Sequence, residues 1–242
     1  MIAFRLSVPQ KKDDMTNDEV RKIVAGHGLP NDMRIGRNPP QGTKAAYFCE
    51  NDTMHVTASP NVLSLLHEAA HCEHQGLLGL RGRTMHARIE CQVGLALASE
   101  VYVGIRLAGV PGFEAQERQA LASIPGFPPT FAQFANLCQT RDGFVGRRYD
   151  GRNLYTVMAA LILMKTLPLL GIETQRPNLT TFAGMTACRG YTGILISAAQ
   201  RLEMMARNGT ALSDWKSIGE LGEQFVGQCI QANVSISAIT GS

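Results

Sequence analysis

Charged residues are scarce in this chain, and neither sign dominates. Asp, Glu, Lys and Arg together make up 18% of the 242 residues, and the formal net charge is only +3. The Lys and Arg residues are scattered and have no aromatic residues between them, unlike the basic stretches of nucleic-acid-binding segments. We therefore expect no nucleic-acid partner. A hydrophobic share of 45% is typical of a globular chain rather than a disordered one.

Hydrophobic runs long enough to cross a membrane are also lacking. The longest run, residues 157–172, contains Lys165 and Pro168 and falls short of the roughly 20 residues that a membrane span needs. Residues 1–14 carry too short an apolar stretch before the first Lys and Asp for a signal peptide. The sequence therefore predicts no membrane insertion and a cytoplasmic location.

The six cysteines include no CxxC pair. A chain of this length does not need disulfide bonds to stabilise its fold, and without an export signal its thiols should stay reduced. We expect these cysteines to pack as small apolar side chains in the core.

Local signals predict an α+β fold that is mainly α. A capping box at Thr16 and Glu19 starts a helix that ends near residue 25. A small antiparallel sheet should follow, with strands at 33–37, 47–49 and 54–57. Further helices are expected at 60–76, 85–107, 114–123, 130–139, 155–167, 181–207 and 214–232. We place a boundary after residue 112, which gives a core of residues 1–112 and a helical subdomain of residues 113–242 packed against it.

Histidine is scarce as well, with six in the chain, yet three of them lie in the segment HEAAHCEH, residues 67–74. This segment should be helical, because Ser59 and Pro60 suit a helix start and Gly76 suits a helix end. No Pro or Gly interrupts residues 61–75.

On such a helix, His67 and His71 share one face and can bind one zinc ion. Glu68 points about 100° away from His67. From there it can take a proton from a zinc-bound water, whose pKa falls to roughly 7. This is the chemistry of the HExxH metallopeptidases. The alternative is an accidental group of polar residues on a solvated helix face.

A catalytic zinc site needs a third protein ligand and one open position. Glu90, 19 residues after His71, is favoured, because a helix returning antiparallel after a turn at residues 81–84 would bring it level with the histidines. A carboxylate among the apolar neighbours of Glu90 would also be costly without a bound cation. For His74 we expect a partly exposed position at the rim of the site. The alternative ligands are Glu100, His74 and His86.

The pattern HEAAH-x18-E resembles that of the gluzincin metallopeptidases. The short helix and hairpin before the motif are similar to the minimal gluzincins of the ImmA/IrrE type, over residues 16–107. The resemblance implies one general base and three zinc ligands, which are Glu68 and then His67, His71 and Glu90. It also implies that the strand before the motif helix is a sheet edge that binds substrate as an added strand. The residues of that strand are Met54, His55 and Val56.

Two supporting groups of this family have no clear counterpart in the sequence. Thermolysin-like members hold a ligand histidine with an Asp four residues after the ligand Glu, where this chain has Gly94. Asp142 and Asp150 are the candidates for that support. Tyr149 and Tyr155 are the candidates for the donor to the tetrahedral oxyanion of peptide hydrolysis.

The sequence therefore predicts a peptidase that uses Zn²⁺ and acts on peptides or proteins. An endopeptidase is favoured, because the sequence has no exopeptidase motif such as GxMEN. The alternative is a catalytically inactive zincin-like module, structural or regulatory, within a larger assembly such as a virus particle. The missing supporting groups suggest that alternative. Nothing in the sequence indicates an oligomeric state.

Overall fold

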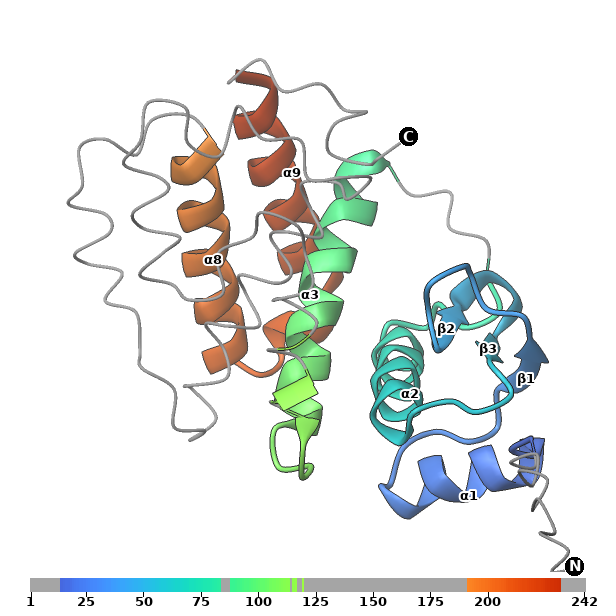
Figure 1. Cartoon of the computed structure of the whole chain (residues 1–242). Helices are drawn as coiled ribbons and strands as arrows, with labels where there is room; N and C mark the ends of the chain where they lie inside the picture. Colours follow the sequence, from blue (N-terminus) through green and yellow to red (C-terminus); the bar gives the residue numbers. More distant parts are fainter. Residues whose placement is uncertain (1–13, 84–87, 114, 117–118, 120–190, 232–242) are drawn as a thin grey trace, which may run out of the picture.

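The computed structural model of the chain describes residues 14–83, 88–113, 115–116, 119 and 191–231. Within these residues a three-stranded sheet and five α-helices form a mainly helical α+β fold, which confirms the predicted fold class. Figure 1 shows α1, α2 and the sheet on one side, with α3, α8 and α9 on the other. The helices predicted at 130–139 and 155–167 lie outside the described residues.

Helix α1 (Asn17–Gly26) begins where the capping box predicts. Thr16 Oγ1 accepts a hydrogen bond from Glu19 N at 3.2 Å, and Glu19 Oε2 accepts one from Thr16 N at 2.6 Å. Val20 and Val24 lie one turn apart and are fully buried. The helix therefore covers the core with a single apolar stripe.

The sheet consists of β1 (Arg34–Arg37), β2 (Ala45–Phe48) and β3 (Thr53–Val56), in the order β1–β3–β2. Strands β2 and β3 form the predicted antiparallel hairpin, joined by the short 3-10 helix η1 (Cys49–Asn51). Strand β1 runs parallel to β3, so the sheet is mixed and the prediction of an antiparallel sheet is wrong. The reason is that the loop at 38–44 carries the chain past the position of β3, which then returns between the two earlier strands.

Helix α2 (Val62–Leu77) carries the HEAAH motif. Its N-cap is Asn61 rather than Ser59, since Asn61 Oδ1 accepts a hydrogen bond from Leu63 N at 2.8 Å. The apolar side of α2 is fully buried against the sheet and α1, and burying each such leucine stabilises the fold by about 1.5–3 kcal/mol. The motif helix is thus fixed on one side by the core, and its histidines lie on another.

Helix α3 (Ile89–Leu107) joins the two groups of elements, because it packs against α2 and, more extensively, against α9 (Trp215–Gln231). Two glycines let α3 and α9 approach closely. A Cβ atom on Gly222 would lie 1.8 Å from the Glu90 carbonyl oxygen, and one on Gly94 would lie 2.2 Å from the Ile218 carbonyl oxygen. Helix α8 (Tyr191–Arg207) and the 3-10 helix η3 (Ala211–Ser213) complete this group.

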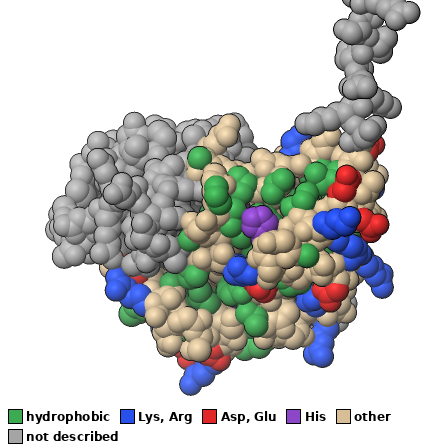
Figure 2. Space-filling model, turned by 90° about the horizontal axis from the view of Figure 1, so that it is seen from below, with side chains coloured by type: hydrophobic (Ala, Val, Ile, Leu, Met, Phe, Trp, Pro, Cys, Tyr) green, Lys and Arg blue, Asp and Glu red, His purple; other side chains and the backbone are tan. Residues whose placement is uncertain are grey.

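The surface of the described residues carries charges of both signs. Figure 2 shows one face of the molecule, where Lys and Arg stand beside Asp and Glu rather than gathering in one area. No helix within the described ranges has the length and apolar character needed to cross a membrane. The absence of a nucleic-acid partner stays a prediction.

Candidate metal centre

Three side chains from α2 and α3 converge between these helices. The Nε2 atoms of His67 and His71 lie 3.1 Å apart. The carboxylate of Glu100 lies 3.5 Å from His71 Nε2 and 3.7 Å from His67 Nε2. Ligand atoms of a tetrahedral zinc ion, at bond lengths of about 2.0–2.1 Å, are separated by about 3.3 Å. The three side chains are therefore spaced as ligands of a single zinc ion.

This cluster is reachable from solvent. The side chains of His67, His71 and Glu100 are 19%, 17% and 24% exposed. Burial raises the pKa of the Glu100 carboxyl, but the charge and hydrogen bond of His71 and the charge of His67 outweigh burial and lower that pKa below its ordinary value. A bound metal ion would require Glu100 ionised and both histidines neutral.

The structure brings Glu100, and not Glu90, to the histidines. Glu90 lies in the first turn of α3, ten residues before Glu100 and therefore about 15 Å away along the helix axis. The expected level of contact is wrong, because the motif residues of α2 meet the middle of α3 rather than its first turn. His71 meets Ser99, and His74, further along α2, meets Tyr102, further along α3.

Ser99 lies where a supporting group for His71 is needed, a role for which the sequence offered only Asp142 and Asp150. Its Oγ atom lies 2.7 Å from Nδ1 of His71, and the residue is only 3% exposed. A ligand histidine needs a partner on the ring nitrogen that faces away from the metal, which fixes the ring and its tautomer. Ser99 precedes Glu100 on α3, so one short segment provides both a ligand and its support. A serine beside a glutamate within an apolar helix was the available signal.

Glu68 lies on a different side of α2 from the three-residue cluster and meets the sheet. Its Oε2 atom accepts a hydrogen bond from the backbone N–H of Tyr47, on β2, at 2.8 Å. The turn of about 100° between consecutive helical residues accounts for this divergence from His67. The carboxylate of the candidate base is therefore directed at strand β2.

Strand β2 is the edge next to α2. Within the described residues it pairs only with β3, where Thr57 N donates to Lys44 O at 3.0 Å. Hydrogen-bonded and non-bonded pairs alternate in an antiparallel ladder. The N–H and C=O groups of Ala45 and Tyr47 consequently point outwards, away from β3.

The predicted substrate-binding edge is wrong, because β3 lies in the middle of the sheet. Met54, His55 and Val56 pair with β1 on one side and with β2 on the other. Met54 and Val56 are fully buried, and His55 Nδ1 lies 2.8 Å from the Arg37 carbonyl oxygen. The backbone groups of β3 are therefore paired on both sides, and β2 is the outer strand of the sheet next to α2.

His74 is not at the rim of the site. It is fully buried, its ring stacks on Tyr102 with centroids 4.7 Å apart, and its Nε2 donates to the Leu212 carbonyl oxygen at 2.6 Å. Burial lowers the pKa of His74 to about 4, so the ring is neutral near pH 7. The side chain ties α2 to α3 and η3 and contributes no ligand to the cluster.

The remaining candidates lie outside the described residues. These are His86, Asp142, Tyr149, Asp150 and Tyr155. The prediction of buried, reduced cysteines is confirmed in part: Cys72 and Cys229 are buried free thiols, whereas Cys49 and Cys91 are partly exposed.

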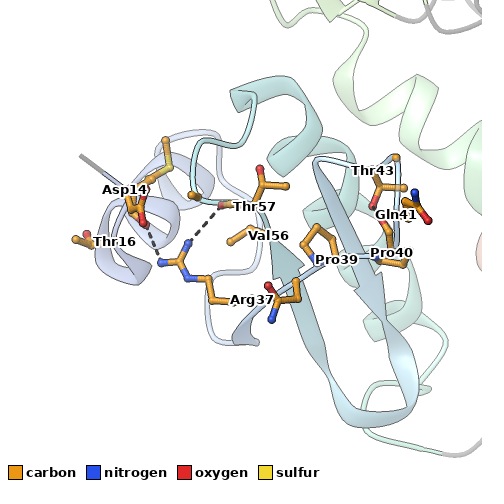
Figure 3. Close-up of a pocket in the computed structure, with 13 residues that line it drawn as sticks. Asp14, Thr16, Arg37, Pro39, Pro40, Gln41, Thr43, Val56 and Thr57 are labelled. Atoms are coloured by element: carbon orange, nitrogen blue, oxygen red, sulfur yellow. Dashed lines mark hydrogen bonds between the residues drawn. The ribbon is translucent and has the colours of Figure 1, made fainter. Parts of the chain in front are cut away.

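A separate hollow lies where β1 and β3 end, around Arg37 and the loop at 38–43. Figure 3 shows the Arg37 guanidinium turned towards the backbone on either side of it. It donates to the carbonyl oxygens of Met15 and Thr57, at 2.7 and 3.4 Å, and to Asn17 Oδ1 at 3.0 Å. Arg37 thus fastens α1 to the sheet, and we assign this hollow no ligand.

Comparisons of the chain with known protein families, with curated proteins and with solved structures find no match.

Proposed function

We propose that this chain is a zinc-dependent metallopeptidase that cleaves within peptide chains. The observation that carries the proposal is the cluster of His67, His71 and Glu100, whose ligand atoms all lie within 4.8 Å of one another. Two imidazoles and one carboxylate are the ligand set of zinc peptidase sites. Their exposure to solvent leaves room for the open position that catalysis needs.

Each residue has a distinct role in this proposal. His67, His71 and Glu100 hold the zinc ion, and Ser99 fixes the ring of His71. A zinc ion supplies a Lewis acid that polarises a carbonyl group and acidifies water. Glu68, one residue after a ligand, takes the proton from the attacking water and delivers it to the leaving amine.

The edge of β2 is the proposed substrate site. Ala45 and Tyr47 face outwards from it, and Tyr47 is bonded directly to Glu68. An extended peptide that adds to this edge gains main-chain hydrogen bonds whatever its side chains are. Such a peptide would run beside the candidate base.

The first experiment measures bound zinc by elemental analysis of the purified chain and four variants. We expect about one zinc per chain, lost in His67→Ala and His71→Ala. Glu100→Gln should lose zinc, whereas Glu90→Gln, on the same helix, is the matched control and should keep it. Zinc loss in Glu90→Gln with retention in Glu100→Gln would refute the ligand assignment.

The second experiment tests catalysis. The zinc-loaded chain and its Glu68→Gln variant are incubated with a mixed peptide library, and cleavage is followed by mass spectrometry. We expect the wild type to cleave peptides and the variant to cleave them at least about a hundredfold more slowly. A positioned general base accelerates the reaction by about 10²–10⁴-fold. Equal cleavage in both would exclude the proposed role of Glu68.

A metal-binding module without catalytic activity is the second candidate. The observation that favours it is the bond between Glu68 and Tyr47 N, which occupies the candidate base within the fold. In that case the chain would bind zinc, but no peptide in the library would be cut. Zinc content and library cleavage together separate the two candidates.

A further inference from the structure

The hydrogen bond between Glu68 and Tyr47 N occupies a group that a peptide strand would need. The Tyr47 N–H points to the outer edge of β2, yet Glu68 Oε2 accepts it at 2.8 Å. One backbone N–H makes one good hydrogen bond at a time. Peptide addition at this position and the bond to Glu68 therefore exclude each other.

Ala45 has the next outward-facing backbone groups on β2, and its surroundings differ from those of Tyr47. Ala45 faces the same edge, two residues earlier, at a spacing of about 7 Å along the strand. Helix α2 places the Glu68 carboxylate opposite Tyr47 and not opposite Ala45. Ala45 is only 5% exposed and lies in the core cluster, whereas Tyr47 is partly exposed. The accessible outward position is therefore the one at Tyr47, where a peptide must displace a carboxylate.

We propose that the Tyr47 N–H is a shared contact, which holds Glu68 in the free protein and passes to a peptide carbonyl when an extended substrate adds to β2. Displacement frees the carboxylate of Glu68, the residue that follows the candidate ligand His67, as the substrate arrives. This inference rests on the proposed peptidase function. It adds that Glu68 becomes available as a base only after the substrate backbone has docked.

The physical basis is an exchange of one acceptor for another on the same donor. The carboxylate bond is charge-assisted and stronger than a bond to a neutral carbonyl. The exchange therefore weakens the binding of a peptide backbone relative to an edge that is free. The same exchange makes the binding site selective for ligands that carry a backbone carbonyl at this position.

The first test measures amide hydrogen exchange in the ¹⁵N-labelled, zinc-loaded chain and in Glu68→Ala. We expect the Tyr47 amide to exchange at least about tenfold faster in the variant, because its acceptor is gone. The Ala45 amide, on the same edge, is the internal control and should not change. An unchanged Tyr47 rate would show that Glu68 does not hold this N–H in solution, which overturns the proposal.

The second test compares two hydroxamates on the same two proteins. One is a peptidyl hydroxamate with an extended three-residue backbone, and the other is acetohydroxamate, which has the same metal-binding group and no peptide. Removing Glu68 affects the hydroxamate group equally in both probes, so the ratio of their affinities isolates the backbone. We expect this ratio to rise about fivefold in Glu68→Ala, the effect of one hydrogen bond freed from competition.

The outcomes distinguish this inference from the function on which it rests. An equal affinity ratio in both proteins, with both probes bound, overturns the shared contact and leaves the metallopeptidase proposal standing. Failure of both probes to bind a zinc-loaded chain overturns both. Binding of both probes, together with the raised ratio, supports both.

Discussion

The hydroxyl of Ser99 lies 2.7 Å from Nδ1 of His71, on the opposite side of the imidazole ring from the nitrogen that faces Glu100. One ring nitrogen is thus directed at the candidate metal position, and the other is fixed from behind. The partner is a neutral hydroxyl rather than a carboxylate.

Replacing Ser99 by alanine should weaken zinc binding by roughly 10–100-fold, the usual effect of losing such a support. The ring of His71 would then lose the contact that sets its orientation and tautomer. Ser99→Thr keeps the hydroxyl and is the matched control, with affinity close to that of the wild type. Competition with a chelator of known affinity measures both. Equal affinities in Ser99→Ala and wild type would remove Ser99 from the site.

The stability of the chain should fall in mild acid because of His74. Its pKa is lowered from 6.5 to about 4 in the folded state, chiefly by burial. Between these values the unfolded chain binds a proton that the folded chain does not, so the free energy of unfolding decreases as the pH falls. The full effect is about 3 kcal/mol and levels off below about pH 4.

Urea unfolding at intervals between about pH 7 and pH 4, with chelator present, tests this prediction for the wild type and for His74→Gln. Glutamine keeps a donor for the Leu212 carbonyl group but does not titrate. We expect a shallower pH dependence in the variant over this window. The same slope in both proteins would mean that other groups cause the acid sensitivity.

Replacing Gly222 by alanine should destabilise the fold by about 3 kcal/mol or more. The new Cβ atom would overlap the carbonyl group of Glu90, and that group can move away only if helix α3 moves with it. Gly219, on the same helix, has nothing within 4 Å of its Cβ position. Gly219→Ala is the matched control and should stabilise α9 by up to about 1 kcal/mol, because alanine favours helix. Thermal unfolding of the two variants should therefore shift in opposite directions. A similar stability of both variants would contradict the close packing of α3 and α9.

Removal of the Tyr47 hydroxyl should affect stability and leave Glu68 unchanged. The hydroxyl donates to Asp52 Oδ1 at 2.8 Å, whereas Glu68 accepts only from the backbone of Tyr47. We expect Tyr47→Phe to lower the free energy of unfolding by about 1 kcal/mol. Its zinc content and the exchange rate of the amide at residue 47 should match those of the wild type. Faster hydrogen exchange of this amide in Tyr47→Phe would show that the side chain, and not the strand, positions the N–H group.

The sequence predicted the local structure of the motif well, because that structure depends on neighbouring residues. The capping box at Thr16 sets the start of α1, and the four-residue spacing of His67 and His71 places both on one face of α2. The N-cap of α2 was placed two residues early. Asn61 and Ser59 are both good capping residues, and only the surrounding contacts choose between them.

The third ligand depends on how two helices cross, which spacing along the chain does not determine. Glu90 and Glu100 both lie on α3, and both have apolar neighbours in sequence. The cost of burying an unpaired carboxylate therefore applied to both. The neighbours of Glu100 are more deeply buried than those of Glu90. Choosing between the two glutamates still required knowing which turns of α3 meet α2. The strand order likewise depends on the path of the loop at 38–44, which places β3 between β1 and β2 and which no local sequence pattern predicts.

Helix α3 presents Ser99 and Glu100 to α2 and, about one and a half turns earlier, places Gly94 against α9. If the proposed centre binds zinc, its occupancy and the docking of α9 should be linked equilibria, because both depend on the position of α3. Because such linkage is reciprocal, zinc would raise the resistance of α9 to unfolding, and any change that pushes α9 away would lower the affinity for zinc by the same free energy. A residue in the last helix, with no contact to the metal, could then act as a remote determinant of its binding.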